Sequence, residues 1–286
     1  MSEYIRKLDT LSYSRLSTFQ RCEHLYNMQY NGMLNESNEI EFPERCTSQS
    51  LSYGQLTHRS IEFSLMNKKE PTFEEVINLL NANEQVQMNN EEGRKIFEGE
   101  ILNYVRAVNE YVKKNNLRYV AHEYKLDVEL KPEFFQSDIN LDIYKKFAGD
   151  IDLILMTPED DYFLVDIKTA GWFYEKKLKT DSFTQYQLAL YKYFYSVQQN
   201  VSTNNIQQAF FILKKGKKTD YFECFKFTAG DKKIKNSLEI IRKMINKVSQ
   251  KNAFFMQNRK NCNNCDLKNT KFCKGSNAMK MFLNNT

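Results

Sequence analysis

The sequence has few prolines and no long apolar segment. Only four of its 286 residues are proline, and together with the abundant Asn and Lys this indicates compositional drift rather than chemistry. No apolar run approaches the ~20 residues that a membrane span needs, and the opening MSEYIRKLDTLSYS lacks the apolar core of a secretory signal. Internal repeats and low-complexity linkers are also absent. We therefore expect a soluble, cytoplasmic protein without membrane partners.

The charge balance is mildly basic. With 41 Lys+Arg against 36 Asp+Glu, the formal net charge is +5, which permits a nucleic-acid partner but does not argue for one alone. Hydrophobic residues make up 41% of the chain, so a core of ordinary size can form. The length suits one large domain or two small ones.

Two kinds of hydrophobic periodicity divide the chain. Spacing typical of helices occurs at 11–30, 50–67, 72–81, about 92–115, about 182–199 and 231–250. Alternation or β-rich composition typical of strands occurs at 119–130, 146–156 and 161–169, and in QQAFFIL and DYFECFKF around the turn KKGKKT. The turn at 158–161 predicts an antiparallel hairpin. This order indicates an α/β or α+β fold around one mixed sheet.

Acidic residues interrupt the two strands of that first hairpin. Asp150 and Asp152 share a strand face, and so do Asp166 and Lys168, because side chains alternate with a period of two. Paired strands would bring these carboxylates together beside a lysine, an arrangement that suits Mg²⁺ or Mn²⁺ and phosphate chemistry. The alternative is a surface ion pair worth at most ~1 kcal/mol.

Two predicted helices carry further polar candidates. His58 and Glu62 lie four residues apart on one helical face after Gly54, although a lone helical histidine is often structural. Gln187 and Tyr191 have the same spacing directly after the Asp-x-Lys strand, where the neighbouring Gln185 leaves the register open. For Tyr193 and Tyr195 we expect packing in the core.

The six cysteines include a C-terminal triplet with metal-ligand spacing. In this triplet, Cys262 and Cys265 are separated by two residues, and Cys273 follows after seven. Clustered cysteines in a reducing compartment favour a metal site over disulfides, and a closed site needs a fourth ligand. Spacing does not choose between Zn²⁺ and an iron–sulphur cluster, nor among the remaining cysteines: Cys22 in a helix, Cys46 in a polar loop, and Cys224, which we expect to pack as a small hydrophobe.

These motifs, in this order, resemble the RecB-like branch of the PD-(D/E)XK nuclease superfamily. More closely, they are similar to its iron–sulphur members, the nuclease domain of AddB and the CRISPR-adaptation exonucleases. The resemblance rests on LSYSRLSTFQRCEHLY with its first cysteine, Gly54…His58, GDIDLI, VDIKT, Gln187…Tyr191 and the final three cysteines. Glu23 stands where relatives often have proline, and the gap before Cys273 is longer than usual.

The resemblance implies a fold and a set of site residues. The fold is a restriction-endonuclease-like α/β core in a single nuclease domain, 1–286, with a helical part (1–117), a catalytic sheet (118–230) and a helix with a cluster-binding tail (231–286). The implied metal ligands for Mg²⁺ or Mn²⁺ are His58, Asp152, Asp166 and the Ile167 carbonyl. The implied catalytic residues are Asp152, Asp166, Lys168, Gln187 and Tyr191, with Asp150 at a variable position.

The resemblance also selects the cluster and the activity. It makes Cys22 the fourth ligand beside Cys262, Cys265 and Cys273, and favours a 4Fe-4S cluster with a structural role over zinc. The expected enzyme is a metal-dependent deoxyribonuclease that degrades single-stranded DNA from its ends, with a helicase or recombination or adaptation proteins as partners. A structure-specific endonuclease on branched DNA and a non-catalytic DNA-binding subunit of a repair complex are the alternatives.

Overall fold

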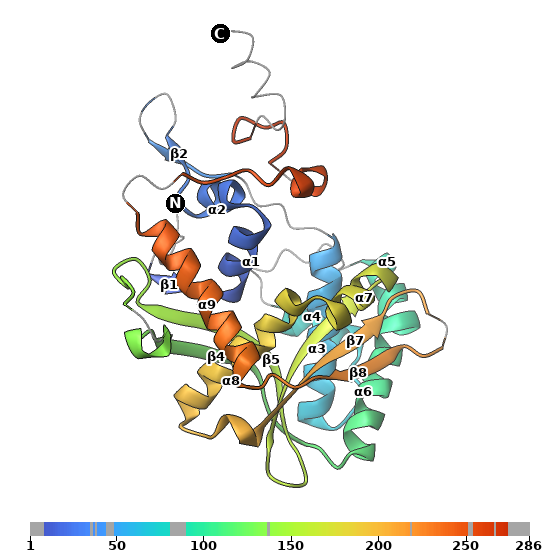
Figure 1. The fold of residues 1–286 in the computed structure, drawn as a ribbon. Coiled ribbons are helices and arrows are strands. Elements are labelled where there is room, and N and C mark those ends of the chain that lie inside the picture. The colour runs from blue at the N-terminus through green and yellow to red at the C-terminus, as the bar shows by residue number, and fades with distance from the viewer. Residues whose placement is uncertain are drawn as a thin grey trace. The chain divides into compact units, whose positions relative to one another are not determined.

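Two compact units make up the computed structural model in Figure 1, and each gathers segments that are distant in sequence. The structure describes residues 9–34, 37, 39–43, 49–80, 90–135, 138–217, 219–250, 254–265 and 267–273. We call the described parts of Cys46–Val128 and Gly149–Ser237 the sheet unit. The described parts of Met1–Arg45, Glu129–Ala148 and Leu238–Thr286 form the cysteine unit.

A mixed β-sheet forms the centre of the sheet unit. Its neighbouring strands are β5, which begins in the cysteine unit, then β6, β7 and β8, and β4 pairs with β5. The β5–β6 and β7–β8 pairs are antiparallel, as both predicted hairpins require, and β6–β7 is parallel. The strands span Arg118–Glu129 (β4), Lys146–Met156 (β5), Tyr162–Ala170 (β6), Ile206–Lys214 (β7) and Phe222–Lys226 (β8).

Helices cover both faces of this sheet (Figure 1). The side chains of Phe163, Val165 and Ile167 in β6 pack with apolar residues of α3 and α6. Because side chains alternate along a strand, the residues between them face the opposite side, where α7 and α8 lie. The helices span Gln49–Asn67 (α3), Leu102–Lys114 (α6), Trp172–Thr180 (α7) and Ser182–Gln199 (α8). The predicted fold, a central mixed sheet flanked by helices, is confirmed.

Shorter elements complete the sheet unit. Thr72 begins α4 (Phe73–Leu79) with a capping box in which Glu75 bonds back to the cap. The helix expected at about 92–115 is three consecutive helical segments: α5 (Glu91–Ile96), a π-helical turn, η1 (Phe97–Ile101), and α6. A 3₁₀ turn, η3 (Thr203–Asn205), precedes β7.

The cysteine unit corrects one prediction. The single helix expected at 11–30 is two helices, since Cys22 between them has extended backbone angles (φ −167°, ψ 116°). The side chain of Ser12 caps the first of these helices by accepting a hydrogen bond from the backbone amide of Arg15. The unit contains β1 (Thr10–Leu11), parallel to the start of β5, α1 (Tyr13–Arg21), α2 (Glu23–Tyr30), β2 (Met33–Leu34), β3 (Ile40–Glu41), η2 (Pro132–Phe135), η4 (Arg259–Asn264) and all but the first seven residues of α9 (Asp231–Val248).

The sequence did not predict α7. Its Gly171 cap has no side-chain hydrogen bond, and Leu178 is its fully buried apolar residue among those whose side chains are described, so neither capping nor periodicity signalled a helix. Within the part of the chain that the structure describes, no helix is long and apolar enough to cross a membrane.

Candidate active site

The candidate site lies where β5 and β6 stop pairing regularly. Their antiparallel register runs from Met156↔Tyr162 to Leu153↔Val165. Alternate amides of a strand point to the same neighbour, so the next amide of β6 that points toward β5 after that of Val165 is that of Ile167. It donates to the Asp152 carboxylate, at 2.7 Å, instead of to a backbone carbonyl. A side chain therefore takes the place of a backbone partner, which holds the Asp152 carboxylate between the two strands.

Asp166 and Lys168 share one face of β6, as strand periodicity predicts. Asp166 is 1% exposed, and its Oδ2 lies 2.6 Å from Lys168 Nζ. This contact is a close ion pair, in which the ammonium of Lys168 stabilises the charged form of Asp166. Burial raises the pKa of Asp166 to about 6, against the opposing effect of the Lys168 charge. The pair is thus a buried, electrostatically costly arrangement rather than a solvated edge.

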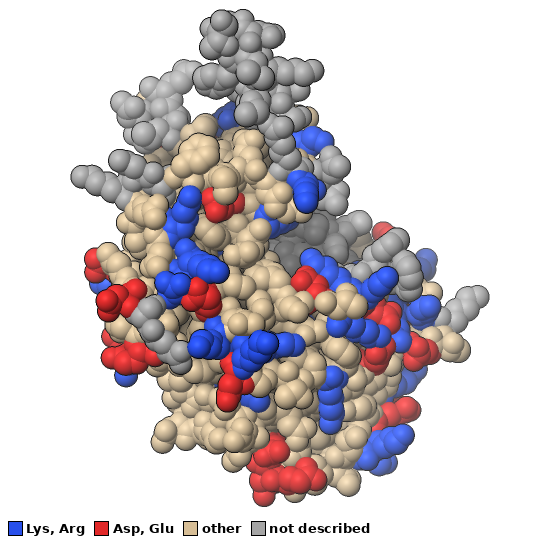
Figure 2. All heavy atoms as spheres, viewed as in Figure 1, with Lys and Arg blue, Asp and Glu red and all other residues tan. Residues whose placement is uncertain are grey.

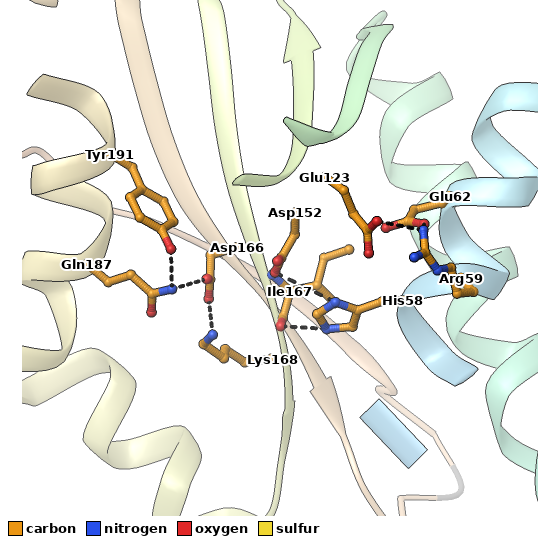
Figure 3. A network of polar contacts seen from close by, with 10 residues as sticks. All are labelled: His58, Arg59, Glu62, Glu123, Asp152, Asp166, Ile167, Lys168, Gln187 and Tyr191. Carbon is orange, nitrogen blue, oxygen red and sulfur yellow. Dashed lines mark hydrogen bonds and ion pairs between the residues drawn. The ribbon is translucent and has the colours of Figure 1, made fainter. Parts of the chain in front are cut away.

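Helix α8 supplies the other partner of Asp166. Gln187 Nε2 donates to Asp166 Oδ1 at 2.7 Å and lies 3.3 Å from the Tyr191 hydroxyl (Figure 3). Gln185 instead bonds the carbonyls of Leu178 and Lys179, so the structure resolves the register that the sequence left open.

Tyr191 explains the glycine of GDIDLI. A Cβ atom on Gly149 would lie 2.8 Å from Tyr191 Cε1, far closer than carbon atoms pack. The absence of a side chain at Gly149 therefore lets the Tyr191 ring lie against β5, and through Gln187 this packing supports the position of the Asp166 carboxylate.

His58 reaches the same place from α3. Its Nε2 lies 3.0 Å from the Ile167 carbonyl oxygen and its Nδ1 lies 3.9 Å from Asp152 Oδ2. Burial, with the charge of Lys168, lowers the pKa of His58 to about 4. The imidazole is therefore neutral at pH 7, and its Nε2–H donates to the carbonyl.

Beside His58 lies an ion-pair network that sequence reasoning missed. Arg59 Nη1 contacts Glu62 at 3.0 Å and Glu123 of β4 at 2.8 Å (Figure 3). Glu123 has a φ of +43°, and the alternation of exposure along β4 slips just before it, as at a β-bulge. The network joins α3 to β4 and so fixes the helix that carries His58. Strand alternation gave no signal for it, because the bulge changes which residues share a face.

Glu62 is a buried acid whose pKa supports a testable prediction. It is 3% exposed, and its Oε1 has no hydrogen-bond partner in the described part of the chain. Burial raises the pKa of Glu62 from 4.5 to about 8, so the folded protein holds this proton more tightly than the unfolded chain. Relative to Glu62→Gln, the wild type should lose ~1–3 kcal/mol of unfolding free energy as the pH rises from 5 to 8.

The measurement is chemical denaturation of both proteins at pH 5 and pH 8 without divalent metal. Glu110→Gln, at an exposed position of α6, is the control and should show no pH-dependent difference. A difference between wild type and Glu62→Gln that stays constant with pH would contradict the prediction.

The donor chemistry of the site suits a hard divalent cation. His58 Nε2 and the Ile167 carbonyl oxygen are 3.0 Å apart, about the separation of adjacent ligands around octahedral Mg²⁺, and Asp152 and Asp166 provide carboxylates. As they stand, no three His, Cys, Asp or Glu side chains among the described residues are grouped tightly enough to hold a metal ion. Lys168 and the Ile167 amide contact the carboxylate oxygens that a cation would take, and the Nε2–H of His58 points at the Ile167 carbonyl oxygen. Cation binding therefore requires these contacts to rearrange and the histidine proton to move to Nδ1.

Within the cysteine unit, the four predicted cluster ligands line one cavity. Cys22, Cys262, Cys265 and Cys273 surround it together with His24 and Leu25. The extended backbone of Cys22 places this residue between α1 and α2, where the amide of Asn258 donates to its sulphur at 3.4 Å.

Cys224 packs against the core of the sheet unit rather than at this cavity. Cys46 lies outside the described residues.

Comparison with solved structures supports the fold. A proposed exonuclease from Eubacterium rectale is 15% identical and superposes with a TM-score of 0.53, covering 92% of this chain and 90% of that chain. The structure of SSO0001 is 11% identical and covers 93% of this chain and 85% of that chain, at a TM-score of 0.41 that is too low to add support. No curated protein matches significantly.

Comparison with family models is more specific. The model that describes the PD-(D/E)XK nuclease superfamily matches residues 10–270, a range that includes every candidate residue of the sheet unit and the cysteines up to Cys265. Because that match covers most of the sequence, the chain belongs to the PD-(D/E)XK nuclease superfamily.

Proposed function

We propose that this protein is a RecB-like, iron–sulphur nuclease that degrades single-stranded DNA from its ends, with Mg²⁺ or Mn²⁺. The observation that carries the proposal is the convergence of His58, Asp152, Asp166 and the Ile167 carbonyl beside Lys168. A divalent ion held by the first four would activate water and offset charge on the attacked phosphate.

The residues around the cation have separate roles in the proposed reaction. His58 is neutral, so its Nε2 would hold a cation without adding charge once the ring proton has moved from Nε2 to Nδ1. Lys168 is 22% exposed on its side chain, so its ammonium can turn from Asp166 toward a scissile phosphate and stabilise the negative charge that develops there. Gln187 keeps the Asp166 carboxylate oriented while this happens.

Of the basic segment 214–218, Lys214 is buried and paired with Asp220 and Glu223, whereas Lys217 is exposed and would follow the phosphate backbone. A helicase partner would supply single strands.

The test is cleavage by the purified chain with Mn²⁺ or Mg²⁺, using linear single strands labelled at either end, circular single strands and branched duplexes. Asp152→Asn provides the background. We expect linear single strands to shorten progressively and circles to resist. Cleavage of circles or of branched junctions alone would favour the endonuclease alternative, and no cleavage above the Asp152→Asn background would overturn the nuclease assignment.

The iron–sulphur part of the proposal rests on the cysteine cavity. The thiols of Cys22, Cys262, Cys265 and Cys273 line this cavity, and thiolate sulphur is the ligand that iron–sulphur clusters take. A bound cluster would join α2 to the C-terminal segment of the cysteine unit and would have a structural role. Zinc is the alternative metal for the same four ligands.

A further inference from the structure

A groove lies between the first turns of α8 and α9, within the sheet unit. Its volume is about 420 Å³, and it is largely open to solvent. Polar groups of Ser182, Thr228 and Asn236 line it together with Tyr186, Lys232 and Lys233. None of these residues touches Asp166 or His58 in the described contacts, so the groove is distinct from the candidate active site.

The charge of this groove favours an anion. Two lysines, Lys232 and Lys233, and one acid, Asp231, line it, so the lining has one positive charge in excess. Lys233 Nζ also donates to Gln185 Oε1 at 2.5 Å. The three charged residues belong to the first turn of an 18-residue helix, whose dipole adds positive potential there. On the face shown in Figure 2, Lys and Arg side chains gather where Figure 1 places the start of α9.

An aromatic ring lines the same groove. Tyr186 is half-buried, with Phe183 packed edge-on against it. Phe227 lies beside the groove, where its ring is already packed: it stacks on Phe225 and Phe210, and Lys233 lies 4.9 Å from its ring centre. Lysines interleaved with partly exposed aromatic rings are the combination that binds single strands, because phosphates meet the charges and unpaired bases stack on the rings.

The position of Tyr186 on α8 connects this groove to the candidate active site. Tyr186 immediately precedes Gln187, which bonds Asp166. Consecutive helical side chains diverge by about 100°, so one residue faces the groove while the next faces the carboxylate. We propose that the groove binds a segment of single-stranded nucleic acid, with Tyr186 stacking on a base and Lys232 and Lys233 contacting phosphates. The choice of DNA as ligand rests on the proposed nuclease function.

The experiment measures binding without cleavage. Fluorescein-labelled oligothymidylate is titrated with the full chain in EDTA, and anisotropy is followed at several NaCl concentrations. Tyr186→Leu should weaken binding roughly 5- to 50-fold while Tyr186→Phe retains it. Lys232→Ala should reduce the slope of log K against log salt by about one, and Lys235→Ala, exposed on the same helix but outside the groove, should leave both affinity and slope near wild type.

Thermal melts first establish that each variant is folded. Wild-type affinity in Tyr186→Leu, or equal slope changes for Lys232→Ala and Lys235→Ala, would overturn the proposal. Equal binding of poly-glutamate, insensitive to Tyr186→Leu, would also overturn it in favour of an acidic protein partner. Since no divalent metal is present, binding can succeed when cleavage fails, so this test is independent of the nuclease assay.

Discussion

Replacing either Asp166 or Lys168 by alanine should reduce Mn²⁺-dependent cleavage by about 10³-fold. Asp166 is buried between the Gln187 amide and the Lys168 ammonium. Its replacement removes a proposed cation ligand, and replacement of Lys168 removes the positive charge nearest to the Asp166 carboxylate. The measurement is single-turnover cleavage of an end-labelled single strand at saturating Mn²⁺.

Asp166→Asn separates this catalytic effect from folding. The amide keeps an acceptor for Gln187 but removes a buried charge whose pKa burial raises, so the unfolding midpoint should equal or exceed that of wild type while cleavage stays lost. Asp150→Ala, on the same strand as Asp152 but exposed, is the matched acidic control and should cleave normally. Wild-type rates in Asp166→Ala and Lys168→Ala would contradict the assignment, whatever the other variants do.

Replacing Cys22 by serine should remove bound iron and destabilise the protein by about 5 kcal/mol. In the chain-entropy model, that is the order of magnitude for a crosslink closing a loop of roughly 240 residues. The measurements are iron content, absorbance near 400 nm and the free energy of unfolding of protein purified without oxygen.

Cys224→Ser is the matched control, because Cys224 packs on the core of the sheet unit rather than at the cavity. It should keep iron, colour and most of the stability. Colourless wild type with one equivalent of zinc would replace the cluster by the zinc alternative, and a Cys22→Ser protein with full iron content would exclude Cys22 as a ligand.

Much of the fold follows from local pattern. The alternation of KFAGDIDLILM and the turn at PEDD predict β5, β6 and their antiparallel pairing, all of which the structure contains. Helices α3 and α8 begin and end within a residue of their predicted limits. Local pattern fails where an element is held by tertiary contacts, as with α7, or where one residue leaves helical geometry, as Cys22 does.

The candidate site divides in the same way. Strand and helix periods by themselves determined that Asp166 and Lys168 share a face and that Gln187 and Tyr191 share another, because those periods are properties of the backbone. Only the tertiary structure decided that β5 and β6 separate so that Asp152 accepts the Ile167 amide, that Gly149 makes room for Tyr191, and that Arg59 ties α3 to Glu123. These contacts join segments far apart along the chain, and their geometry depends on how whole elements pack, which no local repeat encodes.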